Sequence, residues 1–426
     1  MTRLLIFSLF VFLNSASYAQ IAYEESYSTA LKKARITKKP IFILLNPKGI
    51  PNVTNKVGLN GPEATQLYDT SFVNVRLTSG EPDASLMASL FKITATPSYI
   101  FIDRNEQMLF KWHGAKTEEK FFIDIGKEVL DRLEKHTTLS DFDQKYENGE
   151  ISRKFLKDYI SLRIKTGTFD NAHLIEKYVT YLTIAEFNEP GEILFIFKSG
   201  PILSGNAYKL LYNNSKLTRE IFATLPLSER IAINRRIGDN TLKEAIATRN
   251  LSQAMQSADF ASNSHGNDYK AADKRSTWNM MEYYKAVKDT ANFFLSSTRY
   301  YDTHYMSVSL DSIRRANVKA NKTGNSMDKD QTALRLNDAA WAVYEQGTKN
   351  YLYLTKAMLW SKRSIEIDPD PNYYDTLAHI FYRLGLYDEA ILNQNKSIKF
   401  TKLQPALKDK IPGLTLELKK MRERKL

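Results

Sequence analysis

The stretch from Lys39 to Gly114 constrains the fold of this 426-residue chain most strongly. It contains three runs rich in apolar and β-branched residues, which read KPIFILLN, FVNVRLTS and ITATPSYIFIDRNEQMLFKWHG. The segment from Ile41 to Leu45 is apolar at every position, which is typical of a strand buried on both faces of a helix-covered sheet. We therefore predict an α/β domain built around this strand.

Helices and a hairpin are predicted around the strand. Apolar residues in 23–37 recur at the three and four spacing of an amphipathic helix. Short helices are expected over 62–68 and 85–91, a strand over 72–77, a hairpin over 98–103 and 107–112, and a helix over 117–134. The predicted first domain covers residues 20–137.

This order resembles the thioredoxin fold, because KPIF, FVNV and ATPSYIFID occur in the right sequence and spacing. In that family, an active-site loop with a Cys-x-x-Cys motif follows the first strand and faces a turn like Thr96-Pro97. The resemblance places residues 50–53 where the two thiols would be, but the chain contains no cysteine. Thiol-disulfide exchange needs an attacking thiolate and a disulfide partner. We therefore expect a redox-inactive domain.

The Thr96-Pro97 turn has two interpretations. The resemblance implies a cis peptide bond that leaves a backbone edge open, and an extended peptide can pair with such an edge by strand addition. Under this hypothesis Ile50, Pro51, Thr96 and Pro97 form a shallow peptide-contact surface without chemistry. Under the alternative, Pro97 only shapes the fold.

Residues 1–19 have the pattern of a signal peptide. Arg3 precedes an apolar run from Leu4 to Leu13, and Ser17-Tyr18-Ala19 supplies small residues for cleavage after Ala19. The run is about half of the roughly 20 residues that a bilayer helix requires, which argues against the alternative of a membrane anchor. We expect export to the bacterial periplasm, with no transmembrane segment after signal cleavage.

Composition narrows the class of partner. Lys and Arg number 60 and Asp and Glu number 48, for a net charge of +12. These charges are spread along the chain without a nucleic-acid-binding motif, so no nucleic acid partner is predicted. Since the chain has no cysteine, no disulfide cross-link stabilises it, and stability must come chiefly from packing.

From Leu139 onward the apolar spacing becomes helical, and we predict an α-helical region over 138–330. Separate helices are expected over 227–237 and 239–247, a polar segment over 250–274, and one long helix over 278–297. Phe155, Tyr159 and Leu162 make an apolar stripe that neighbouring helices must bury.

Residues 331–426 resemble tetratricopeptide repeats followed by a basic tail. Asn337 to Pro369 and Pro371 to Phe400 form successive helix-turn-helix units, in which small residues such as Ala378 and Ala390 let two helices approach closely. Because at least three stacked units are usually needed for stability, the middle helices are expected to serve as neighbours. The predicted fold is thus a thioredoxin-like α/β domain followed by an all-α, TPR-like helical-repeat domain.

A polar stripe lies on the first helix of the second unit. Asp375, His379 and Arg383 recur every four residues and therefore share one helix face. This face has two interpretations, a peptide groove and an ordinary solvated surface.

No enzyme motif is found in the chain. The six histidines are scattered without an HExxH pattern, and the sequence contains no phosphate-binding loop and no GxSxG elbow. We predict no catalytic residue, cofactor or metal ligand, and we interpret the chain as an exported module that binds an unidentified peptide or protein, in an oligomeric state left open. The alternatives are a thioredoxin-family disulfide oxidoreductase or isomerase, which the absence of cysteine disfavours, and a periplasmic chaperone-like stress protein.

Overall fold

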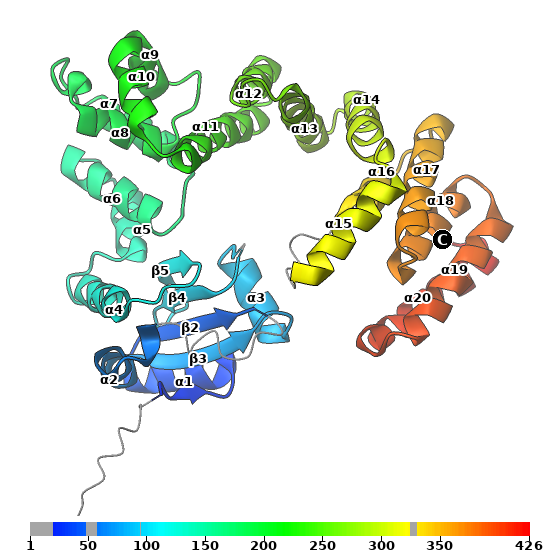
Figure 1. Ribbon diagram of the computed structural model, residues 1–426, viewed down its shortest axis with the longest axis horizontal. Helices are drawn as coiled ribbons and strands as arrows, with labels where there is room; N and C mark the ends of the chain where they lie inside the picture. Colours follow the sequence, from blue (N-terminus) through cyan, green and yellow to red (C-terminus); the bar gives the residue numbers. More distant parts are fainter. Residues whose placement is uncertain (1–19, 48–57, 94, 324–329) are drawn as a thin grey trace, which may run out of the picture. The chain divides into compact units, whose positions relative to one another are not determined.

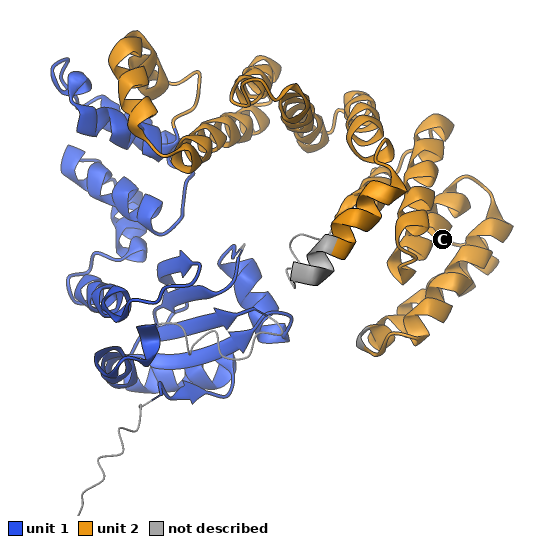
Figure 2. Cartoon of the chain, viewed as in Figure 1, with its two compact units in different colours: residues 1–200 blue, residues 201–426 orange. Residues whose placement is uncertain are grey.

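The computed structural model describes residues 20–47, 58–93, 95–323 and 330–426 (Figure 1). The chain divides into two compact units, residues 1–200 and residues 201–426 (Figure 2). This division falls inside the helical region predicted over 138–330, so the first helices of that region belong to the same unit as the sheet. The candidate signal peptide over 1–19 lies outside the described residues.

The first unit begins with a five-stranded mixed sheet in the order β1-β3-β2-β4-β5. Its strands are β1 (Tyr23–Glu24), β2 (Ile41–Asn46), β3 (Val73–Thr78), β4 (Ser98–Ile102) and β5 (Met108–His113). β3 runs parallel to both β1 and β2, whereas β4 runs antiparallel to both β2 and β5. β2 is therefore the central strand, and all of its residues are buried.

Helices cover both faces of this sheet. They are α1 (Tyr27–Thr37), α2 (Pro62–Ser71), α3 (Pro82–Leu90) and α4 (Glu119–Glu134). Since successive side chains of a strand point to opposite faces, Phe42 and Leu44 join a core cluster with residues of α2 and α4. Ile41 and Ile43 join a second cluster with residues of α1 and α3. Burial on both faces thus accounts for the continuous apolar run of β2, as predicted.

The predicted order of helices and strands around β2 is confirmed, with differences at several boundaries. Residues 23–24 form a short strand paired with β3, and α1 begins after Ser26, whose side chain accepts a hydrogen bond from the Thr29 N–H. The helix expected over 85–91 begins earlier, at Pro82. Proline suits the first position of a helix, because its missing N–H would have no partner there.

Four helices complete the first unit: α5 (Leu139–Glu147), α6 (Arg153–Lys165), α7 (Ala172–Val179) and α8 (Pro190–Ser199), with the short helix η3 (Glu186–Asn188) before the last. The apolar stripe predicted on α6 packs against α5, where the rings of Tyr159 and Phe142 stack with centroids 5.5 Å apart. Lys165 of α6 pairs with Glu128 of α4 at 2.5 Å. The helices after the sheet therefore contact α4 directly, in addition to their covalent connection to it.

The elements that the structure describes in the second unit are all helices. In its first part these are α9 (Asn206–Asn213), α10 (Ser215–Thr224), α11 (Leu227–Thr248), α12 (Leu251–Asn263), α13 (Tyr269–Val287), α14 (Thr290–Tyr301), the π-helix η4 (Asp302–Met306) and α15 (Leu310–Thr323). The two helices predicted over 227–247 are one, and the polar segment 250–274 lies mostly in α12 and α13. The single helix predicted over 278–297 is divided at Lys288, whose positive φ of 63° ends α13. Among the residues described, none of the helices combines the length and apolarity needed to cross a membrane.

The second unit ends in α16 (Thr332–Glu345), α17 (Tyr351–Ile367), α18 (Pro371–Arg383), α19 (Tyr387–Lys402), the 3-10 helix η6 (Pro405–Lys410) and α20 (Ile411–Arg422). Consecutive helices in this series pack against one another. Ala378 and Ala390 are fully buried in α18 and α19, and Gly385 takes a positive φ of 77° in the turn between them. The predicted helix pairs are confirmed, and their assignment to tetratricopeptide repeats stays a prediction.

The packing of β2 yields a first testable prediction. Phe42 is fully buried, and its ring centroid lies 4.7 Å from that of Tyr68 and 5.0 Å from that of Phe101. Replacing Phe42 by alanine leaves a cavity among these rings and should lower the free energy of unfolding by about 3 to 5 kcal/mol. Hydrogen exchange of the β2 amides measures this loss, because buried strands exchange through global opening.

Ile36 of α1 provides the control, since its side chain is 81% exposed. Ile36→Ala should change the free energy of unfolding by no more than about 0.5 kcal/mol. Equal losses in the two variants would show that β2 is not the centre of this core.

Candidate functional site

The predicted Thr96-Pro97 turn lies where β4 begins, beside the C-terminal end of β2. Its peptide bond is cis, as the resemblance implied, and both residues are partly exposed. The Pro97 carbonyl accepts a hydrogen bond from the Gly114 N–H at 2.9 Å. Within the described chain, the backbone N–H and carbonyl of Thr96 make no hydrogen bond. Ile50 and Pro51, which we expected to face this turn, lie outside the described residues.

Ser98 and His113 meet directly after this turn. Ser98 is fully buried, and its Oγ lies 2.7 Å from His113 Nδ1. The Ser98 hydroxyl donates to the Ala95 carbonyl, so its oxygen accepts from the His113 Nδ1–H. A nucleophilic serine must instead give its proton to the imidazole. The pair therefore fixes the turn to β5 and lacks the arrangement of a serine nucleophile and its base.

The surroundings of His113 favour its neutral form. Burial lowers the pKa of His113, and the nearby positive charge of Lys111 lowers it further. Lys111 is itself half-buried and donates to the Phe91 carbonyl at 3.1 Å. The contact with Ser98 requires a proton on His113 Nδ1, which the neutral Nδ1–H tautomer supplies.

A carboxylate occupies the N-terminus of α2, the α-helix that precedes β3. Glu119 Oε1 accepts hydrogen bonds from the backbone N–H groups of Glu63 at 2.9 Å and Ala64 at 3.0 Å. Gly61 leaves room for this side chain, because a Cβ there would lie 2.0 Å from Glu119 Cδ. Helix N-termini stabilise anions, including cysteine thiolates. Here the protein's own side chain takes that place.

The polar stripe of α18 is partly covered. His379 is only 3% exposed, and its ring lies edge-on to Trp341 and Tyr344 of α16. Arg383 lies over the Tyr344 ring, 3.7 Å from its centroid, and donates to the Tyr344 carbonyl. Asp375 and Arg383 keep partial exposure. Since α16 covers His379, this residue does not line an open groove, whereas the two interpretations of the stripe as a whole stay predictions.

Glu417 of α20 joins this stripe, which the sequence did not indicate. Its Oε2 lies 3.5 Å from His379 Nε2, and Asp375 Oδ2 lies 3.7 Å from His379 Nδ1. Burial raises the pKa of the Glu417 carboxyl, and Asp375 raises it further against the opposing effects of His379 and Lys420. Asp375, His379 and Glu417 are called the α18–α20 cluster below.

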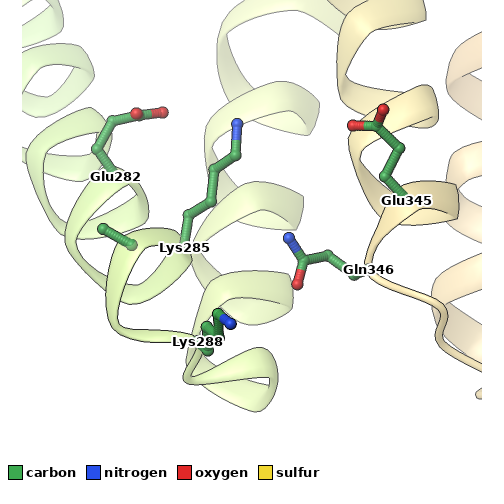
Figure 3. Close-up of a pocket in the computed structure, with 6 residues that line it drawn as sticks. Glu282, Lys285, Lys288, Glu345 and Gln346 are labelled. Carbon is green, nitrogen blue, oxygen red and sulfur yellow. The ribbon is translucent and has the colours of Figure 1, made fainter.

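A pocket of about 580 Å³ lies elsewhere in the second unit, lined by Glu282, Lys285, Ala286, Lys288, Glu345 and Gln346. Figure 3 shows side chains from the end of α13 and the end of α16 facing this space. Its lining is mostly charged, whereas pockets for small molecules are predominantly apolar with a few polar groups. We assign no ligand to it.

Comparison with solved structures finds thioredoxin-like proteins. A structure described as DsbH Oxidoreductase is 18% identical, with 26% of this chain and 86% of that chain covered and a TM-score of 0.23. A solution structure of a thioredoxin from Thermus thermophilus is 17% identical, with 26% of this chain and 88% of that chain covered and a TM-score of 0.24. No model of a known protein family and no curated protein sequence matches the chain.

The capped N-terminus of α2 gives a second prediction. Glu119→Ala removes the acceptor of two backbone N–H groups and a favourable charge, and should destabilise α2 by about 1 to 2 kcal/mol. Glu119→Gln should cost less, because its amide oxygen still accepts. Hydrogen exchange of the Glu63 and Ala64 amides measures both effects. Glu118→Ala is the matched control, since Glu118 makes no side-chain capping bond, and equal losses in Glu119→Ala and Glu118→Ala would contradict the assignment.

The environment of His113 gives a third prediction, on pH. Because its folded-state pKa lies below the ordinary 6.5, the unfolded chain takes up the proton first as the pH falls through 6.5. Stability should therefore decrease until the pH drops below the folded-state pKa. NMR titration of the His113 ring should give a pKa below 6.5, and His113→Asn should remove this part of the pH dependence. A His113 ring that titrates at or above 6.5 would refute the prediction.

Proposed function

We propose that this chain is an exported, redox-inactive thioredoxin-like protein that binds extended peptide segments of a protein partner. The observation that carries the proposal is the complete absence of cysteine from a chain whose N-terminal mixed sheet and helices resemble the thioredoxin-like fold. Without a thiolate, the chain cannot itself exchange disulfides. We therefore assign it binding rather than oxidation or reduction.

The occupied N-terminus of α2 supports this assignment. A helix N-terminus lowers the pKa of a nearby thiol and so favours the reactive thiolate. In this chain the N-terminus of α2 is occupied by the Glu119 carboxylate, which already accepts from two backbone N–H groups. The local electrostatics, like the composition, thus suit a structural role at this end of the sheet better than thiol chemistry.

The backbone of Thr96 supplies the proposed contact. Its N–H and carbonyl have no partner in the described chain, and the next residue, Pro97, has no N–H to donate. An extended peptide alongside Thr96 gains main-chain hydrogen bonds, which provide affinity with little dependence on sequence. Ser98 and His113 hold this backbone in place through their mutual hydrogen bond.

The C-terminal helices provide a second part of the proposal. We propose that α16–α17 and α18–α19 are tetratricopeptide-like units that help to hold the partner. Their short turns and the buried small residues Ala378 and Ala390 support this, since small residues allow close helix approach. The proposed location is the bacterial periplasm, on the basis of the signal-like pattern over 1–19.

A peptide display screen tests the proposed contact and is the fourth prediction. We expect enriched extended peptides to bind the full chain and to shift the NMR signals of Thr96, Ser98 and His113. Thr96→Arg places a long charged side chain at the contact and should weaken binding by at least about 10-fold, or 1.4 kcal/mol.

Thr70→Arg is the matched control. Thr70 is exposed near the C-terminal end of α2, which leads into the start of β3, so it lies at the opposite end of the sheet from Thr96. Equal weakening by the two substitutions, or shifts confined to other surfaces, would reject the Thr96 contact. Turnover above background in an insulin reduction assay would reject the redox-inactive assignment.

A further inference from the structure

The α18–α20 cluster brings together three potential metal ligands. Asp375, His379 and Glu417 each offer one nitrogen or oxygen atom, and these three atoms lie within 4.8 Å of one another. Two of these residues come from α18 and the third from α20, so the cluster connects separate helices. Independently of the proposed peptide binding, we propose that this cluster binds a divalent transition-metal ion of the Zn²⁺ type.

The hydrogen bonding of His379 suits metal binding. Its Nδ1 lies 2.8 Å from the backbone carbonyl of Asp375, so Nδ1 carries a proton and donates it. In the neutral ring, Nε2 then presents a lone pair toward Glu417 Oε2, 3.5 Å away. A metal-binding histidine commonly donates its other N–H to a carbonyl in this way, which fixes the ring and its tautomer. Two acceptors that face each other also require a cation or a proton between them.

The donor set and spacing agree with zinc. One imidazole nitrogen and two carboxylates are ordinary Zn²⁺ ligands, whereas Ca²⁺ takes six to eight oxygen ligands. In a tetrahedral site with bonds of about 2.0 to 2.2 Å, ligand atoms lie about 3.3 to 3.6 Å apart. The separation of 3.5 Å between His379 Nε2 and Glu417 Oε2 falls in this range, and the full set of three ligand atoms lies within 4.8 Å of one another.

A fourth side chain points independently to a ligand. Gln394 of α19 is fully buried, and its Nε2 donates to Asp375 Oδ1 at 2.8 Å. This bond holds the Asp375 carboxylate and leaves Oδ2 for a metal ion. The same amide has a buried oxygen, Oε1, without a hydrogen-bond partner in the described chain. Buried polar atoms are rarely left unpaired, so a water molecule or an ion is expected beside this amide.

Titration of tag-free, chelator-treated full-length protein with ZnCl₂ in a calorimeter tests the proposal. We expect one Zn²⁺ per chain with micromolar or tighter affinity. His379→Gln and Glu417→Gln should each weaken binding by at least about 100-fold, and Gln394→Ala by about 10-fold as a positioning residue. Zn²⁺ should also raise the thermal unfolding temperature of the unsubstituted protein but not that of Glu417→Gln.

His265→Gln is the matched control, because His265 is exposed and distant from the cluster in sequence. It should leave Zn²⁺ affinity unchanged. Far-UV circular dichroism shows whether each variant is folded. If His379→Gln is unfolded, the Zn²⁺ affinity of the near-isosteric Glu417→Gln tests the proposal instead. Zn²⁺ binding that persists unchanged in Glu417→Gln, or no binding to the unsubstituted protein at millimolar Zn²⁺, would overturn the proposal in favour of a His379–Glu417 ion pair.

Discussion

The burial of β2 on both faces is the constraint on which the first unit depends. Its alternating side chains anchor one helix layer through Phe42 and Leu44 and the other through Ile41 and Ile43. The same strand fixes β4 in register, with Leu45 opposite Ser98, and so sets the position of the turn before Ser98. None of these contacts involves cysteine, because the chain contains none. The packing around β2 therefore needs no thiol and no disulfide.

Elements with strong local patterns could be predicted from the sequence, and those made by distant contacts could not. The runs of β2, β4 and β5 are recognisable from their own apolar residues. By contrast, Tyr23–Glu24 is a strand only because it pairs with β3, a contact that no local pattern encodes. The separate helices predicted over 227–237 and 239–247 are one helix, α11, in which Gly238 is buried and its carbonyl accepts from Ser257 Oγ of α12 at 2.8 Å. Packing overrides the helix-weakening effect of glycine there.

The same limit applies to the candidate sites. Helical spacing placed Asp375, His379 and Arg383 on one face. The residues that contact this face come from α16 and α20, and from the sequence we assigned the region of α20 to a basic tail. Glu119 lies in the first turn of its own helix, α4, whereas its carboxylate caps α2. In both cases the sequence indicated the residue type and the helix face on which it lies. It did not indicate which residues or elements it contacts, because these come from another part of the chain.

These sites together indicate where a partner can gain binding energy. Most polar groups near the sheet end already have internal partners: Glu119 caps α2, and Ser98 accepts from His113. The Thr96 backbone makes no hydrogen bond within the described chain, and one short stretch of main-chain bonding gives only modest affinity. A partner that also engaged the helical unit would bind with an increased effective concentration at the second contact. Joining two weak, sequence-tolerant contacts in one chain is therefore a physical route to useful affinity without catalysis.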